Sequence, residues 1–191
     1  MRIQRAVDLR PESITFKSPQ KTADNNYRSA TCLEDGSMVI LQMPPMKLDA
    51  YNLDPDSGRL FVDFKLTNNE LYQVLRRVDS HTIQTVFNNR MSWFSVGDVS
   101  MASVEDSYSS PIIKGADAPL VRFRPNAVET AFFVNKSLSD AQCMEGCPMA
   151  TAIVQLRGLT LFKDSMSPEW VLHSLKVTKA TTTEQFEFSE L

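Results

Sequence analysis

The chain has 191 residues, of which 42% are apolar and 23% are charged, and both values are close to the averages of globular proteins. This length and composition fit one domain with a buried core and exclude a chain that is disordered throughout. The net charge of −3 comes from three acids within the last twelve residues, so the rest of the chain is neutral and any site for a polyanion must be a local patch. No stretch is apolar over the ~18 residues that a bilayer requires, and we expect no membrane partner.

The N-terminal third contains an irregular segment followed by strand patterns. Residues 1–28 are polar, contain two prolines and show no regular hydrophobic period, so we expect a loose N-terminal arm there. Apolar segments at 37–43 and 47–53, separated by Pro44 and Pro45, predict two strands or one strand with a bulge. The segment 59–67 alternates strictly between apolar residues and a face that carries charges, which predicts a strand with one buried side.

Helical spacing follows, and then a second group of strands. Asn68 or Asn69 can cap a helix, and apolar residues recur three and four positions apart through Phe87. Ser100 and the acids after it predict a short second helix. Strand candidates cover residues 119–124, 130–134, 150–162 and 169–178. Gly158, inside one of these candidates, predicts a bulge or a tight bend.

These elements predict a mainly β fold. We expect a small antiparallel OB-like barrel over residues 29–179, with a helical insertion between its second and third strands, and a flexible acidic tail over 180–191. Because the strands do not alternate with helices, the pattern excludes most nucleotide-dependent α/β enzymes.

Enzymatic chemistry has little support in the sequence. The glycine patterns that bind phosphate or dinucleotides are absent, and His81 and His173 are the only histidines. Cys143 and Cys147 would leave a zinc site two ligands short locally, and an odd total of three cysteines fits a reducing compartment. We expect no catalytic residue, metal or cofactor, with a metal-dependent enzyme that uses the carboxylates or the cysteine loop as one alternative.

Aromatic and basic residues share a strand face, which points to nucleic acid. Alternation places Phe61 on the outer face between Arg59 and Lys65, and places Arg122 and Arg124 outward on another strand. Such rings and cations suit the bases and phosphates of a single strand, although Phe61 packed under the arm or a helix is the alternative. The predicted nucleic-acid-binding residues are Tyr51, Arg59, Phe61, Lys65, Arg122 and Arg124.

The C-terminal segment TTTEQFEFSEL has three acids, two phenylalanines and no base. It is either a frayed end or an acidic peptide with aromatic anchors, which a partner protein with a basic, apolar pocket can bind. The predicted partner-binding residues of this tail are Phe186, Glu187, Phe188 and Glu190.

Four segments together resemble the single-stranded-DNA-binding proteins of nucleocytoplasmic large DNA viruses, over roughly residues 59–178. The segments are SWF at 92–94, VEDSYSSPIIK at 104–114, LRGLTLF at 156–162 and PEWVLHSLKV at 168–177. The resemblance implies an OB-fold core and a viral accessory protein of DNA replication, recombination or repair that coats exposed strands in the cytoplasm or nucleus of an infected cell. It also implies replication proteins as partners of the tail. The main rival is a β-rich virion or scaffold protein that acts through protein contacts.

Overall fold

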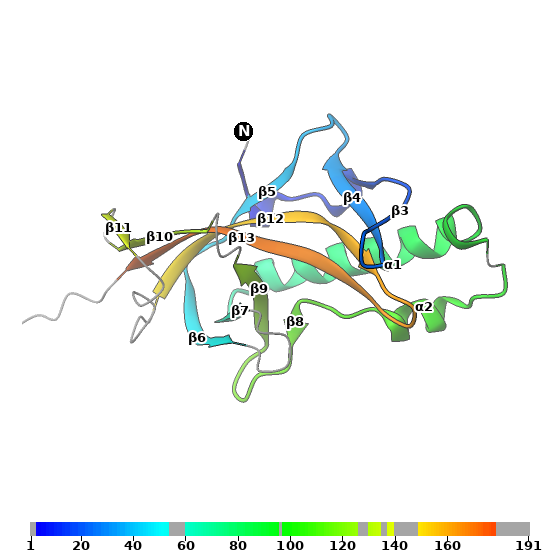
Figure 1. Cartoon of the computed structure of the whole chain (residues 1–191). Helices are drawn as coiled ribbons and strands as arrows, with labels where there is room; N and C mark the ends of the chain where they lie inside the picture. Colours follow the sequence, from blue (N-terminus) through cyan, green and yellow to red (C-terminus); the bar gives the residue numbers. More distant parts are fainter. Residues whose placement is uncertain are drawn as a thin grey trace, which may run out of the picture.

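The computed structural model describes residues 3–53, 60–95, 97–125, 130–134, 137–139 and 149–178 (Figure 1). The fold is mainly β, as predicted. The strands are β1 (Gln4–Arg5), β2 (Ile14–Phe16), β3 (Gln20–Lys21), β4 (Tyr27–Leu33), β5 (Val39–Gln42), β6 (Met46–Leu53), β7 (Leu60–Lys65), β8 (Ile112–Ile113), β9 (Leu120–Pro125), β10 (Ala131–Val134), β11 (Ser137–Ser139), β12 (Met149–Leu161) and β13 (Met166–Thr178). The helices are α1 (Asn69–Phe94) and α2 (Met101–Ser107), with single 3-10 turns at Ala6–Asp8 and Pro11–Ser13.

The central feature is a closed ring of paired strands in the order β6, β7, β9, β13, β12 and back to β6. The long antiparallel pair β12–β13 forms its largest part and runs along much of the molecule in Figure 1. Both helices lie between β7 and β9 in the sequence, which confirms the predicted insertion between the second and third strands of the ring. The barrel was predicted to be antiparallel, but one pair of the ring, β9 and β13, is parallel.

The ring encloses the main hydrophobic core. Val62 and Phe64 of β7 and Val121 and Phe123 of β9 are all fully buried, as the alternation of both segments predicted. The Phe64 and Phe123 rings lie 6.0 Å apart, with the strands that carry them paired directly. Every second residue of these strands therefore faces outward, which fixes the orientation of the predicted binding residues.

Helix α1 begins where the sequence predicted and packs against two separate hydrophobic clusters. The Asn68 side chain accepts a hydrogen bond from the Leu71 amide at 2.9 Å, which caps the helix. Leu71 and Leu75 lie in the main core, whereas Val86 lies in a second cluster with Val104 of α2 and the β12–β13 turn region. Within the described residues, no helix is long and apolar enough to cross a membrane.

The prediction of a loose N-terminal arm was wrong for the residues that the structure describes. Ala6, Leu9 and Ile14 are buried in the main core, and β2 and β3 pair with β4. The Ile14 carbonyl lies 2.9 Å from Nε2 of His81 on α1, which ties this segment to the helix. Because turns and very short strands are too short to produce a regular hydrophobic period, this segment looked irregular in the sequence.

Gly158 allows β4 to approach β12. The strand pair β12–β13 changes register between Leu156 and Gly158, which confirms the predicted bulge. A Cβ atom at position 158 would lie 2.3 Å from the Ser29 carbonyl oxygen, so only glycine permits the Gly158–Ala30 pairing. The bulge brings β4 onto the outer edge of the ring.

Candidate nucleic-acid interface

Four side chains of β7 and β9 meet on the outer surface of the ring and are called the Arg–Phe cluster. They are Phe61, Asp63, Arg122 and Arg124, and the register pairs Asp63 directly with Arg122. The Arg122 guanidinium carbon lies 4.8 Å from the centre of the Phe61 ring, and that of Arg124 lies 5.4 Å from it. The Phe61 ring is half-buried, and these distances are those of cation–π contacts. The predicted combination of an aromatic ring with neighbouring cations is present.

Arg122 is held by an ion pair with a buried carboxylate. Its Nε donates to Oδ1 of Asp63 at 2.8 Å, and its Nη2 donates to Oδ2 at 2.7 Å. The Asp63 side chain is only 5% exposed, whereas 38% of the Arg122 side chain is exposed. Two parallel bonds fix the guanidinium in place and balance its charge. Alternation placed Asp63 on this face but gave no sign of the pairing.

Lys65 faces outward as predicted but lies among acids. Its Nζ is 3.1 Å from Asp117 and 3.6 Å from Asp49. The hydrogen bond with Asp117 raises the pKa of Lys65 above its usual value, and the charges of Asp117 and Asp49 add to the effect. Two carboxylates around one ammonium make this a poor place for phosphate.

The other predicted site residues are not brought to the cluster by the described part of the chain. The backbone of Tyr51 pairs with Val62, while its side chain lies outside the described residues. Arg59 also lies outside them. The same holds for the tail residues Phe186, Glu187, Phe188 and Glu190 and for the cysteine pair Cys143 and Cys147.

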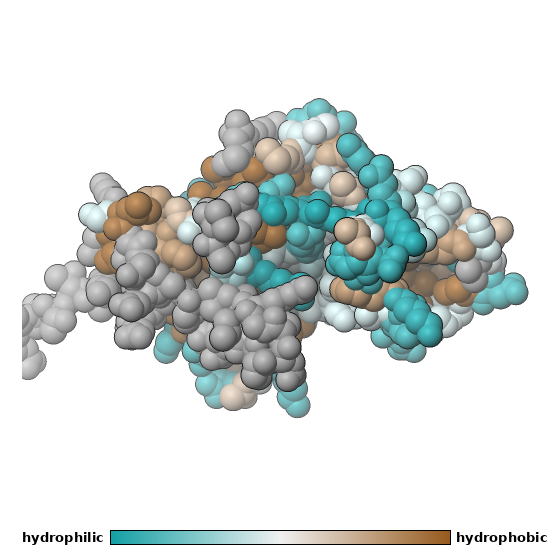
Figure 2. Space-filling model, viewed as in Figure 1, coloured by the Kyte–Doolittle hydropathy of each residue, from teal (hydrophilic) through white to brown (hydrophobic). Residues whose placement is uncertain are grey.

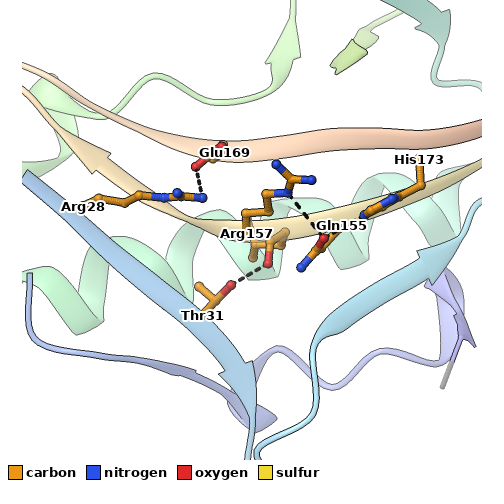
Figure 3. Close-up of polar contacts among 7 residues, drawn as sticks. Arg28, Thr31, Gln155, Arg157, Glu169 and His173 are labelled. Atoms are coloured by element: carbon orange, nitrogen blue, oxygen red, sulfur yellow. Dashed lines mark hydrogen bonds and ion pairs between the residues drawn. The ribbon is translucent and has the colours of Figure 1, made fainter. Parts of the chain in front are cut away.

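A set of polar residues that sequence reasoning missed lies on β13, β12 and β4 and is called the polar row. Its members are Arg28, Gln155, Arg157, Glu169 and His173 (Figure 3). The register places Arg124 beside Val171 and Val171 beside Gln155, so the row begins on the strand face that carries the Arg–Phe cluster. Figure 2 shows a hydrophilic surface where β12 and β13 cross the centre of the molecule.

Two bulges organise the polar row around Gln155. The register of β12–β13 skips His173 on one side and Arg157 on the other, and bulged residues have their side chains redirected. His173 Nε2 lies 2.7 Å from Oε1 of Gln155, and Arg157 Nε donates to the same oxygen at 3.5 Å. Farther along, Arg28 pairs with Glu169 at 2.6 Å. The broken alternation around Gly158 was the one signal in the sequence that could have revealed these residues.

A buried acid positions the segment beside the Arg–Phe cluster. Asp79 of α1 accepts hydrogen bonds from the Tyr108 hydroxyl at 2.7 Å and from the Ser110 hydroxyl at 2.6 Å. Burial raises the pKa of Asp79, although both hydrogen bonds act in the opposite direction. The next residue, Pro111, accepts a hydrogen bond from the Arg122 amide at 2.9 Å. The carboxylate thus fixes the wall next to β9.

The described residues contain no candidate metal site. No three histidine, cysteine or acidic side chains gather there in a way that would hold an ion. His81 and His173 contact a carbonyl and an amide oxygen, respectively, and lie on different elements. The chemistry of the surface is therefore best described by its arginines, its amide and its aromatic ring.

Comparison with known proteins gives structural similarities only. No protein-family model matches the chain, and no curated protein sequence matches it. Among solved structures, the single-stranded DNA-binding protein of bacteriophage Enc34 in complex with ssDNA is 10% identical, with a TM-score of 0.49 over 86% of this chain and 96% of that one. The bacteriophage T7 single-stranded DNA-binding protein gp2.5 is 11% identical, with a TM-score of 0.44 over 79% of this chain and 92% of that one. At this level of similarity, function has to be argued from the side chains of this chain.

Proposed function

We propose that this chain is a non-catalytic protein that binds single-stranded DNA along the outer surface of its ring, with little preference for sequence. The observation that carries the proposal is that the Arg–Phe cluster and the start of the polar row lie on the same face of neighbouring strands. The two sets hold four arginines against two carboxylates, Asp63 and Glu169, on a chain with a net charge of −3. A local cationic surface with an aromatic ring fits unstacked bases and the phosphates between them.

The order in which the strands of the ring pair supports the proposal of an OB-like barrel. Its strands pair in the chain order first, second, third, fifth, fourth and back to the first, which is a Greek-key closure and not an up-and-down meander. A small barrel of this type presents side chains on a curved sheet surface where a single strand can lie. Protection of exposed strands during viral DNA replication, recombination or repair is the biological role that we propose for it.

The acidic C-terminal segment is proposed to bind replication proteins and to compete with DNA. Three carboxylates act as a competing anion for a cationic surface, and two phenylalanines can anchor in a partner. Deletion of residues 181–191 should preserve the fold and raise the affinity for short oligonucleotides at low salt. Unchanged or weaker binding of the truncated protein would argue against competition.

The direct test is a titration of labelled oligonucleotides followed by fluorescence anisotropy at several salt concentrations. Single strands should bind well above a duplex of the same length, and the affinity should fall as salt rises, because phosphate contacts release counterions. A titration at low salt without binding to any single strand would refute the proposed function.

A scaffold role is the second candidate, because an apolar surface lies at the other end of the molecule. Met91, Phe94 and Phe162 are 58%, 39% and 43% exposed. Phe94 and Phe162 line a pocket of about 330 Å³ between α1, α2 and the β12–β13 turn. Sedimentation analysis separates the two functions: concentration-dependent assembly without oligonucleotide binding would favour the scaffold role.

A further inference from the structure

A small pocket opens beside the Arg–Phe cluster, between β9 and β13. The two strands pair only at Arg124–Val171 and Pro125–Leu172, and before that point they diverge. The segment around Ser109 bridges the gap, because the Ser109 amide donates to the Met166 carbonyl at 2.8 Å. The space left between them is about 100 Å³, which is well below the size of a pocket for a drug-sized ligand. Its volume suits one small group.

The lining combines ring faces, hydroxyls and cations. Phe61, Pro168 and Trp170 provide apolar surfaces, Ser109 and Ser167 add hydroxyl groups, and Arg122 and Arg124 lie along the β9 side. Flat apolar faces accept a planar heterocycle, and the arginines lie where an attached phosphate would need a cation. A nucleobase on a sugar-phosphate chain has this chemistry.

The indole of Trp170 supplies an independent observation. This residue is only 2% exposed, and its Nε1 has no hydrogen-bond partner within the described part of the chain. Buried indole N–H groups usually have an acceptor, because an unsatisfied buried donor is costly. The indole lies in the pocket wall with its N–H covered by neighbouring atoms.

We propose that this pocket takes one unstacked base of the bound strand, with Trp170 in the pocket wall and Arg124 near the adjoining phosphate. The inference rests on the proposed single-strand binding and adds a defined position at which the protein holds a base. Phe61 then forms part of the pocket wall as well as of the cationic surface.

The test uses the two tryptophans of the chain. Trp93 belongs to α1 and packs with the second cluster, so the Trp93→Phe variant keeps Trp170 as the single reporter. Titration with an oligothymidine should change Trp170 emission in parallel with the anisotropy of the labelled strand. An oligonucleotide of equal length with abasic sites keeps the phosphates and should leave the emission unchanged.

Two variants test the pocket without the reporter. Ser167→Phe fills the pocket and should weaken oligothymidine binding at least fivefold, whereas the control Ser80→Phe, on the exposed side of α1, should bind like the parent.

The outcomes separate the pocket from the proposed function. If the labelled strand binds while Trp170 emission stays constant and Ser167→Phe binds like Ser80→Phe, the pocket holds no base, and the proposed function stands. If no single strand binds at all, both are refuted.

Discussion

Arg122 should be more important for stability than its neighbour Arg124. Arg122→Ala removes the partner of the Asp63 carboxylate, whose side chain is 5% exposed in the intact pair. Loss of one member of a buried pair costs about 3–5 kcal/mol, and because 38% of the Arg122 side chain is in contact with water, we expect about 2 kcal/mol. Arg124→Ala is the matched control on the same strand, and its cost should stay below about 1 kcal/mol.

Urea unfolding of the two variants measures this difference, with equal m-values as the sign that unfolding remains comparable. Replacement of both partners, Asp63→Leu with Arg122→Met, should recover most of the loss, because no buried charge is left alone. An Arg122→Ala protein with the unfolding midpoint of the parent would refute the reasoning.

The same variants test which of the two arginines contacts a DNA phosphate. Arg124→Ala should make the salt dependence of binding shallower by about one unit, the value for one lost phosphate contact. The double replacement of Asp63 and Arg122 should leave that slope unchanged, because the charge of Arg122 is balanced by Asp63 in the free protein. An equal decrease in both variants would show that the ion pair opens on binding and that Arg122 contacts phosphate.

Three further changes test other parts of the structure. Phe61→Ala should weaken oligonucleotide binding by ~1–3 kcal/mol in an anisotropy titration with an unchanged salt slope, and parent-like binding would remove Phe61 from the site. Burial raises the pKa of Asp79, so the parent should lose stability relative to Asp79→Asn as the pH rises from 3.8 through that raised pKa. Urea unfolding across this range should show a difference in stability between the two proteins that becomes constant above the raised pKa. Gly158→Ala should destabilise the fold by about 1–3 kcal/mol in urea, because its Cβ would collide with the Ser29 carbonyl; an unchanged midpoint would contradict the close approach of β4.

Local patterns predicted the regular elements well. Strict alternation in 59–67 and 119–124 was sufficient to orient Phe61 and Arg124, because side chains alternate between the two faces of any strand. The Asn68 cap and the bulge at Gly158 also followed from single residues whose conformational preferences are strong. These features depend on neighbours in the sequence and need no knowledge of the tertiary fold.

The features that the sequence could not predict depend on pairing between strands that are distant in the chain. The parallel contact of β9 with β13 depends on two strands more than forty positions apart in the chain, and it created the pocket at Trp170. The pairing of Arg122 with Asp63 depends on the register of β7 against β9. Alternation reports the face on which a side chain lies but gives no information on which residue faces it across the strands.

Helix α1 joins two hydrophobic clusters, and Phe16 packs against both of them. Its first turns are anchored among the strands of the ring by Leu71 and Leu75, whereas its last turns depend on Val86 and on α2. Cooperative units of a protein separate where few buried contacts cross between them. The far end of α1, with α2 and the β12–β13 turn, can therefore melt as a subglobal unit while the strands that carry the Arg–Phe cluster stay folded. A partner that grips or loosens that end would leave the strand-binding surface in place.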